Sequence, residues 1–239
     1  LHKKFRAKAR LLAGLLDHDG KLSSKEAADL KITSSVIQGL ERDGVVRQIS
    51  RVQYRNPFAG KFEQTGIQRT LTEEQKNAVD GIWDEYAQGI RKTYLLEGVT
   101  GSGKTEVYME LISRVIAEGK QAIVLIPEIA LTFQTVRRFY ERFGDRVSVM
   151  HSRLSEGERY DQFLRAKAGE IDVMIGPRSA LFTPFSQIGV MIIDEEHEGA
   201  YKSETVPRYD AREVAAVRAK KHGASLILGS ATPSVETSR

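Results

Sequence analysis

The stretch that most constrains this chain is residues 98–105, GVTGSGKT, which match the pattern G-x-x-x-x-G-K-[ST]. An apolar run over residues 93–97 precedes it, and a helix-like stretch over residues 106–112 follows it. Glycines let the backbone curl so that successive N–H groups point at phosphate oxygens, and the helix adds its positive N-terminal end. The sequence therefore predicts a strand, a phosphate-binding loop and a helix, rather than a glycine-rich turn that binds nothing.

The loop pattern gives roles to particular side chains. Lys104 is expected to reach the β- and γ-phosphates of a nucleotide, and the hydroxyl of Thr105 to hold Mg²⁺. The loop residues expected to contact the nucleotide are Gly98, Thr100, Gly101, Ser102, Gly103, Lys104 and Thr105.

A second motif, VMIIDEEH over residues 190–197, places two acids directly after four apolar residues. The apolar residues predict a buried strand. Asp194 at its end is expected to bind Mg²⁺, and Glu195 to polarise the water that attacks the γ-phosphate. Adjacent acids repel each other unless a cation is close, and the Mg²⁺ of the phosphate loop supplies one. The alternative is a plain acidic turn.

A third expectation concerns His197 and two residues with side-chain hydroxyl groups. His197 could couple the nucleotide state to Ser230 and Thr232, or it could be an ordinary surface residue.

Residues 67–239 alternate strand-like and helix-like runs, which predicts an α/β fold with a parallel sheet and helices on both faces. The expected strands cover 93–97, 121–126, 147–150, 172–175, 190–193 and 225–228, and the expected helices 72–88, 106–112, 131–143, 156–168 and 211–221. Ligands of such sheets bind at the carboxyl ends of the strands, where every polar motif of this segment falls.

Residues 1–58 read as a separate small module. Apolar stripes and capping residues predict three short helices, the second capped by Ser23 and the third by Thr33 or Ser34. A strand-like run over residues 45–55 follows, so the module reads as a winged helix-turn-helix. Its arginines at 47, 51 and 55 could contact DNA phosphates, or the module could serve only for packing. Residues 59–66 are expected to be a linker.

Charge and composition narrow the setting. The net charge is +4, but residues 1–58 hold 12 Lys or Arg and 6 Asp or Glu, a net of +6. This basic module fits a polyanionic partner or ordinary solubilising charge. There is no cysteine, no long apolar run and no signal peptide, which together predict a cytoplasmic protein without a membrane partner.

Several stretches resemble the motifs of superfamily-2 helicases. They are LTEEQ from residue 71, GVTGSGKTEVY from 98, IPEIALT from 126, RSALF from 178, IDEEH from 193 and GSATPS from 229. In combination they resemble the primosomal protein N′ (PriA) family of bacterial replication-restart DNA helicases. This resemblance implies a RecA-like first helicase lobe after a small winged-helix domain, with Gln75 reading adenine.

The resemblance also implies a function. Such a protein is an ATP-dependent 3′→5′ DNA helicase that uses ATP and Mg²⁺, recognises forked and single-stranded DNA, and works with primosome proteins and single-stranded-DNA-binding protein. The family carries an N-terminal DNA 3′-end-binding domain, a second lobe with an arginine finger, and zinc-binding cysteines, none of which occurs in these residues. Zinc is thus expected only in other parts of a parent protein. The chain has no initiator Met, so we expect a piece of a longer protein. Without a second lobe no arginine finger reaches the γ-phosphate, so we expect this piece to bind nucleotide weakly and to hydrolyse it poorly.

The segment after the acidic motif interleaves aromatic and basic residues, which suits stacking on single-stranded bases. The family has an aromatic-rich loop here that couples DNA contact to ATP hydrolysis. The residues expected to bind DNA are Thr132, Arg178, Ser179, Tyr201, Lys202, Tyr209 and Arg212. The alternatives are that the tyrosines pack on the lobe and that Thr132 only caps a helix.

Two other functions compete with this interpretation. A nucleotide-excision-repair motor shares GVTGSGKT, but the DEEH form and the position of the winged helix argue against it. An ATP-gated DNA-binding scaffold would use the same site with little motor action.

Overall fold

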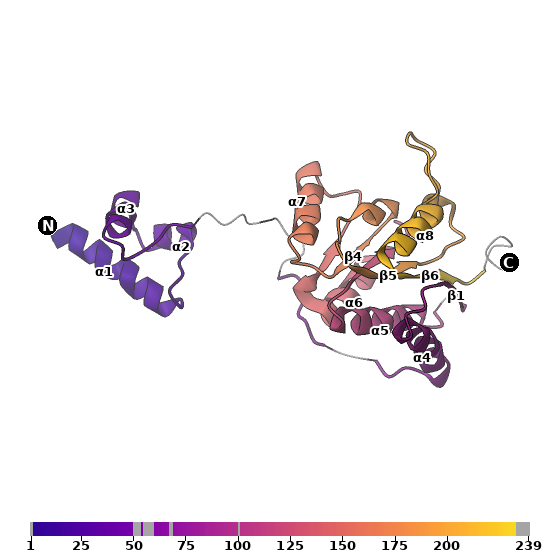
Figure 1. Cartoon of the computed structure of the whole chain (residues 1–239). Coiled ribbons are helices and arrows are strands. Elements are labelled where there is room, and N and C mark those ends of the chain that lie inside the picture. The colour runs from indigo at the N-terminus through magenta and orange to yellow at the C-terminus, as the bar shows by residue number, and fades with distance from the viewer. Residues whose placement is uncertain (1, 50–53, 55–59, 67–68, 100, 233–239) are drawn as a thin grey trace. The chain divides into compact units, whose positions relative to one another are not determined.

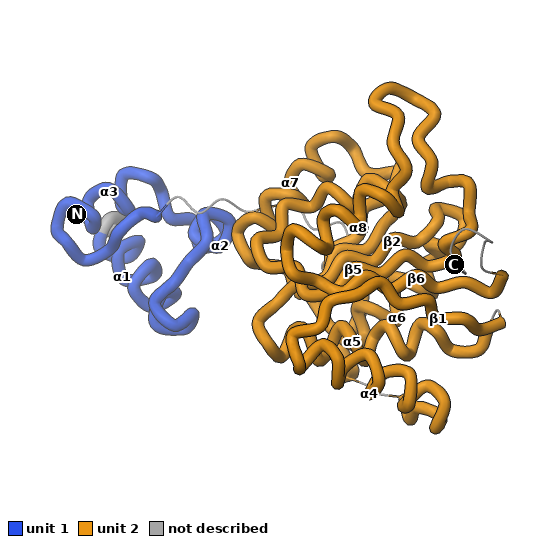
Figure 2. The backbone as a smooth tube through the Cα atoms, turned by 45° about the vertical axis from the view of Figure 1, so that its right-hand side comes forward, with its two compact units in different colours: residues 1–53 blue, residues 54–239 orange. Residues whose placement is uncertain are grey.

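The structure is a computed structural model that describes residues 2–49, 54, 60–66, 69–99 and 101–232 (Figure 1). The chain divides into two compact units, residues 1–53 and residues 54–239 (Figure 2). Thr100 of the phosphate loop and residues 233 and 234 of the GSATPS stretch lie outside the described residues.

The first unit contains the three expected helices, α1 (His2–Asp17), α2 (Ser24–Asp29) and α3 (Ser34–Arg42). Ser23 caps α2 in a capping box with Glu26, because each side chain accepts a hydrogen bond from the other residue's backbone N–H. The buried side chains of the unit are Ala7, Leu11, Ala27, Ile32, Val36 and Leu40. Three amphipathic helices thus share one small core.

The first part of the β-ribbon expected over residues 45–55 is not formed. Residues 45–49 have no regular structure, and residues 50–53 and 55, with Arg51 and Arg55, lie outside the described residues. Two backbone N–H groups that a ladder would use instead bond to α3: that of Val45 donates to the carbonyl of Leu40 and that of Gln48 to the side chain of Glu41. The winged-helix interpretation therefore stays a prediction.

The second unit is built on a six-stranded parallel sheet in the order β1-β6-β5-β2-β4-β3. The strands are β1 (Thr93–Glu97), β2 (Gln121–Leu125), β3 (Val147–Val149), β4 (Val173–Gly176), β5 (Ile188–Ile193) and β6 (Ser225–Ser230). β2 to β6 are buried along their whole length, as their nearly continuous apolar sequences predict.

Helices cover both faces of this sheet (Figure 1). One face packs against α4 (Glu73–Ala87), α5 (Lys104–Ala117) and α6 (Phe133–Phe143). The other packs against α7 (Glu156–Lys167), α8 (Ala211–His222) and the short 3-10 helix η2 (Arg178–Phe182). This is the RecA-like α/β fold that the alternating pattern and the family resemblance predicted.

Residues 60–66, which the sequence predicted to be part of a linker, lie against α6. The backbone N–H groups of Thr65 and Gly66 donate to the carbonyl of Glu141, at 3.1 and 3.0 Å. The ring of Phe62 packs against Phe133 and Tyr140, with centroid distances of 5.1 and 5.2 Å. This segment is therefore attached to the surface of the second unit, because its aromatic ring finds an apolar site there.

The strand order determines which loops meet. The last residues of β1 and β6 pair in register, Glu97 with Ser230, and those of β2 and β5 likewise, Leu125 with Ile193. Since β6 lies between β1 and β5, the segment after β6 lies between the phosphate loop and the acidic motif. Among the described residues, no helix is both long enough and apolar enough to cross a bilayer.

Candidate nucleotide and nucleic-acid site

The phosphate loop is curled back on itself at the N-terminus of α5. The N–H of Ser102 donates to the carbonyl of Val99 at 3.0 Å, and the ammonium of Lys104 donates to the carbonyl of Gly98 at 2.6 Å. Gly103 has a φ of +89°, and a Cβ there would come within 2.1 Å of the amide nitrogen of Gln75. Glycine is therefore required both by the turn and by this close approach.

Gln75 links the loop to α4. Its backbone N–H and side-chain oxygen form a capping box with Thr72, while its amide Nε2 donates to the carbonyl of Ser102 at 3.0 Å. The side chain expected to read adenine thus also fixes the phosphate loop. This second contact had no signal in the sequence, because it joins residues from different elements.

Lys104 and the acidic motif come together at the carboxyl ends of the strands. Lys104 begins α5 directly after the loop, and Asp194 and Glu195 directly follow β5. The Lys104 ammonium lies 3.8 Å from a carboxylate oxygen of Glu195, and the Lys104 side chain is only 8% exposed. The buried cation can hold phosphate oxygens, and the carboxylate that faces it can orient a water.

Asp194 is enclosed more than its neighbour. Burial is the main cause that raises the pKa of the Asp194 carboxyl, and the Glu195 charge raises it further. The hydroxyl of Tyr108 donates to its Oδ1 at 2.9 Å and, with Lys104, acts in the opposite direction on this pKa. A nearby cation would therefore stabilise the charged form of this buried carboxylate.

Glu195 has a left-handed backbone conformation, with a φ of +48°. Residues other than glycine rarely adopt this conformation, and it persists where the surroundings hold it. The flanking peptides are held: the N–H of Asp194 donates to Leu125, and that of Glu196 to Gly229, both at 2.9 Å. The turn directs the Glu195 side chain toward Lys104.

His197 contacts both the acidic motif and the segment after β6. Its Nδ1 lies 3.0 Å from the hydroxyl oxygen of Ser230 and 3.8 Å from a carboxylate oxygen of Glu195. The hydroxyl oxygen of Ser230 accepts a hydrogen bond from the backbone N–H of Thr232 at 3.2 Å. The structure thus brings together the three residues for which the sequence predicted a coupling role.

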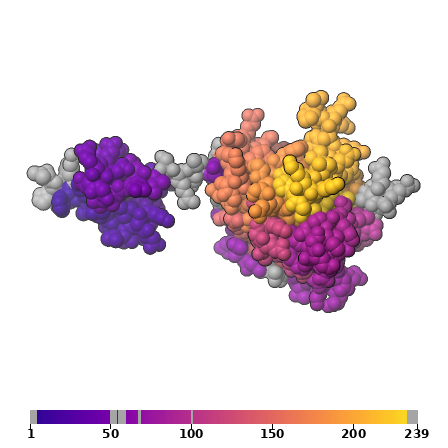
Figure 3. Space-filling model, in the orientation of Figure 1, coloured from indigo at the N-terminus to yellow at the C-terminus, as the bar shows by residue number. Residues whose placement is uncertain are grey.

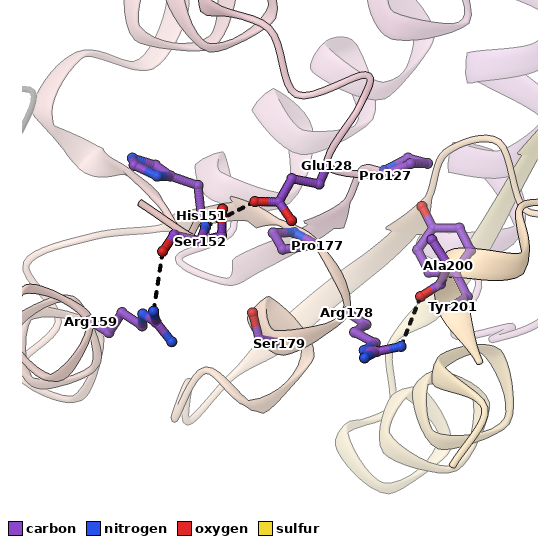
Figure 4. A pocket seen from close by; sticks show the side chains of 10 residues that line it. All are labelled: Pro127, Glu128, His151, Ser152, Arg159, Pro177, Arg178, Ser179, Ala200 and Tyr201. Atoms are coloured by element: carbon purple, nitrogen blue, oxygen red, sulfur yellow. Dashed lines mark hydrogen bonds between the residues drawn. The ribbon is translucent and has the colours of Figure 1, made fainter. Parts of the chain in front are cut away.

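A cleft of about 370 Å³ opens beside this site. Figure 4 shows its lining, which follows the ends of β2, β3 and β4 and reaches the segment after the acidic motif. The residues are Pro127, Glu128, His151, Ser152, Arg159, Pro177, Arg178, Ser179, Ala200 and Tyr201. Arg178 and Ser179, both predicted to contact DNA, therefore lie in one cleft.

The polar walls of the cleft are held by local bonds. Glu128 accepts the backbone N–H of Ser152 at 3.1 Å. Hydrogen bonding with the Ser152 side chain, and secondarily with this N–H, lowers the pKa of the Glu128 carboxyl. Arg178 donates to the carbonyls of Ala200 and Lys202, at 3.3 and 2.7 Å. Burial lowers the pKa of His151, and the positive charge of Arg153 adds to this effect. Arg178 thus also holds the loop that follows the acidic motif.

The prediction that Tyr201 stacks on DNA bases is wrong. The Tyr201 side chain belongs to the core, at 1% exposed, so neither face of its ring is open to a base. Its hydroxyl lies within hydrogen-bond distance of the carbonyls of Asp194 (2.6 Å) and Leu125 (3.1 Å). Burial raises the pKa of its hydroxyl. Tyr201 therefore packs on the lobe, as the alternative interpretation held.

Arg212 and Thr132 have internal roles in this structure. The guanidinium of Arg212 donates to both carboxylate oxygens of Asp210, at 2.9 and 2.6 Å, and to the carbonyl of Glu196 at 2.9 Å. The Thr132 hydroxyl accepts the N–H of Thr135 and so caps α6. Contacts of these residues with DNA stay predictions.

The segment from Lys202 to Asp210 stands out from the surface of the second unit (Figure 3). Lys202 and Asp210 form an antiparallel bridge at its base, and the Val206 side chain is 90% exposed. The ring of Tyr209 packs edge-on against the exposed ring of Phe182, with centroids 5.4 Å apart. Lys202 is exposed, so this surface combines a cation with two rings.

The sequence interpretation missed Tyr108 and Phe182. Tyr108 follows Thr105 by three residues, so the helical repeat places both on one face of α5, which was an available signal. Phe182 ends the RSALF stretch, and its contact with Tyr209 joins segments that are distant in the sequence.

Comparison with known proteins shows which proteins this chain is similar to. Residues 68–235 match the family described as "Type III restriction enzyme, res subunit". "Replication restart protein PriA" of Bacillus subtilis (strain 168) is 46% identical over 86% of this chain, which spans 26% of that protein. PriA of Chlamydia pneumoniae is 40% identical over 99% of the chain, which spans 32% of that protein.

One solved structure extends the likeness to the fold. "Structure of RecG bound to three-way DNA junction" superposes with a TM-score of 0.54 and 27% identity over 70% of this chain and 22% of that one. The family match covers the whole sheet and both motifs that meet at its edge. The chain therefore belongs to the family described as "Type III restriction enzyme, res subunit", with a RecA-like helicase lobe similar to that of PriA proteins.

Proposed function

We propose that this chain is the ATP-binding lobe of an ATP-dependent 3′→5′ DNA helicase of replication restart. The observation that carries the proposal is the meeting of Lys104 with the Asp194–Glu195 pair at neighbouring strand ends, with a distance of 3.8 Å between Lys104 and Glu195. The likeness to PriA proteins supports the replication-restart part, and the RecG structure on a DNA junction supports DNA as the partner.

The oxygen donors at the site suit Mg²⁺. The Thr105 hydroxyl and the Asp194 carboxylate come from segments that meet there, and Mg²⁺ in nucleotide sites takes one or two protein oxygens besides phosphates and water. Within the described residues, no group of three or more His, Cys, Asp or Glu could hold a metal. The Thr105 hydroxyl and the Asp194 carboxylate instead fit a Mg²⁺ site that phosphate oxygens of a bound nucleotide would complete. When bound, Mg²⁺ would neutralise charge on the phosphate oxygens.

The proposed steps use the chain's own groups. Backbone N–H groups of the loop and the Lys104 ammonium bind the triphosphate, and Gln75 contacts adenine through its amide while holding the loop at Ser102. Glu195 orients a water and takes its proton, because it is the carboxylate that faces Lys104. His197 relays the state of the site to Ser230 and Thr232.

DNA is proposed to run along the cleft and the projecting segment. Ser179 and Arg178 lie in the cleft, and Thr132 caps α6, which follows the Pro127 wall in the chain. Lys202 and Tyr209 stand beside it, so a phosphate backbone and one or more bases can be held together. The proposed partners also include primosome proteins and single-stranded-DNA-binding protein, and the proposed location is the cytoplasm.

The proposal is tested by nucleotide binding and by strand displacement. The 239-residue chain should bind Mg²⁺–ADP, and Lys104→Ala should remove this binding. In the full-length protein the same substitution should abolish unwinding of forked DNA. An arginine finger on a second lobe contributes roughly 10³–10⁵ in rate, so we expect hydrolysis by this lobe alone to be slow.

Two results would contradict the proposal. Binding of Mg²⁺–ADP that is unchanged in Lys104→Ala would exclude this nucleotide site. A full-length protein that hydrolyses ATP on DNA but separates no strands would instead be an ATP-gated scaffold.

A further inference from the structure

Tyr108 is a buried hydroxyl residue that points at the acidic motif. It lies on α5, one turn after Thr105, and is 1% exposed. Its hydroxyl donates to Oδ1 of Asp194 at 2.9 Å. The phosphate-loop helix therefore carries two hydroxyl groups on one face, and the deeper one bonds to the carboxylate.

Gly229 near the end of β6 provides the space for this bond. A Cβ at Gly229 would lie 1.6 Å from the Tyr108 hydroxyl oxygen, 2.9 Å from its Cζ and 3.2 Å from Oδ1 of Asp194. A side chain at Gly229 and the bond between Tyr108 and Asp194 thus exclude each other. This glycine has ordinary backbone angles, since its φ is not among the positive ones. Its reason for being glycine is space and not conformation.

The backbone of Asp194 is held separately from its side chain. Its N–H donates to the carbonyl of Leu125, and its own carbonyl lies 2.6 Å from the Tyr201 hydroxyl. These contacts leave the rotation of the carboxylate to be set by other groups. The bond from Tyr108 meets one carboxylate oxygen and leaves the other available for a metal-bound water.

We propose that Tyr108 is a positioning residue that, in the space left by Gly229, fixes the Asp194 carboxylate for Mg²⁺ and so sets how strongly Mg²⁺ tightens nucleotide binding. This inference rests on the proposed function, because it concerns the same site. Partners that orient a metal-binding carboxylate are worth roughly 10–100-fold in metal affinity. If the hydroxyl served only for packing, its removal would affect nucleotide binding equally with and without Mg²⁺.

The experiment measures ADP binding to the 239-residue chain by calorimetry, with excess Mg²⁺ and with EDTA. The ratio of the two dissociation constants is the magnesium gain. Tyr108→Phe should reduce this gain roughly tenfold and leave binding in EDTA within about twofold. Tyr86→Phe is the matched control, since Tyr86 is also buried and its hydroxyl accepts from Lys120, which directly precedes β2.

A second variant keeps the inference testable if the tyrosine variant binds too weakly. Gly229→Ala should displace the Tyr108 hydroxyl, lower the magnesium gain and lower the melting temperature. Adding Tyr108→Phe to Gly229→Ala removes the 1.6 Å contact, so the double variant should melt above Gly229→Ala alone.

The outcomes separate this inference from the proposed function. If the wild-type chain shows no magnesium gain, the proposed function fails. If the wild type shows a gain that Tyr108→Phe leaves unchanged, only the role of Tyr108 fails. A Gly229→Ala variant with unaltered gain and melting temperature would overturn the inference by itself.

Discussion

The Lys104 ammonium lies 3.8 Å from the Glu195 carboxylate although the two residues belong to different βα units of the sheet. The strand order explains this proximity. β1 and β5 are separated only by β6, and parallel strands present their carboxyl ends on the same edge. The geometry thus joins a phosphate-binding cation with a candidate general base.

Glu195→Gln should separate binding from hydrolysis. A glutamine keeps the size of the side chain but takes no proton, so ATP hydrolysis by the full-length protein should fall roughly 10²–10⁴-fold. Binding of Mg²⁺–ADP, measured by calorimetry, should stay within a few-fold. Glu198→Gln is the control, because Glu198 is bonded to Glu195 through its backbone N–H. Equal losses in both variants would show that the acid at 195 has no special role.

His197→Ala and Ser230→Ala should act as one unit. The Nδ1 of His197 lies 3.0 Å from the Ser230 hydroxyl, so either substitution removes the same contact. DNA-stimulated ATP hydrolysis by the full-length protein should fall in each variant, and the double variant should be no worse than the more impaired single one. Additive losses would mean that the two residues work independently and that the proposed relay is wrong.

The sequence predicted best those parts of the site whose residues are close together along the chain. The phosphate loop needs a strand before it and a helix after it, and both could be recognised within a short stretch. The capping boxes at Ser23 and Thr72 were likewise visible in a few residues. The meeting of Lys104 with Glu195 followed from general rules on parallel sheets, since both residues follow strand ends.

Contacts between distant segments were less predictable. Tyr201 and Tyr209 both follow the acidic motif among charged residues, yet one is buried at the strand ends and the other lies near the surface. Composition does not separate them, because burial depends on where η3 (Gly199–Tyr201) turns back over β2 and β5. Phe62 likewise lies in a segment whose sequence predicts a linker, because its partners Phe133 and Tyr140 are far along the chain.

Alanine substitutions should separate the two tyrosines. Tyr201→Ala removes a buried aromatic ring, which costs roughly 3–5 kcal/mol of unfolding free energy. Tyr209→Ala should change stability much less, because its ring is only partly buried, and should lower the DNA-stimulated ATPase of the full-length protein. Chemical denaturation and ATPase assays measure the two effects. Unchanged DNA stimulation in Tyr209→Ala would exclude its coupling role.

The buried carboxylate of Asp194 should lower the free energy of unfolding at neutral pH. Burial raises the pKa of this carboxyl, so at neutral pH the charged form is less favourable in the folded than in the unfolded chain. Asp194→Asn removes the charge but keeps an oxygen that can accept from Tyr108. In the absence of Mg²⁺ and nucleotide, this variant should melt above the wild type at pH 7.

The pH dependence of this gain has a definite sign. As the pH falls through the raised pKa of folded Asp194, the wild type takes up a proton and the advantage of Asp194→Asn should shrink. It should vanish below the unfolded value of 3.8. Asp210→Asn is the opposite control, because bonding to Arg212 lowers the pKa of Asp210. That variant should melt below the wild type at pH 7, and its deficit should disappear as acid protonates Asp210. A stability gain for Asp194→Asn that does not change with pH would contradict a charged, buried Asp194, and thermal scans over a pH series decide between the two.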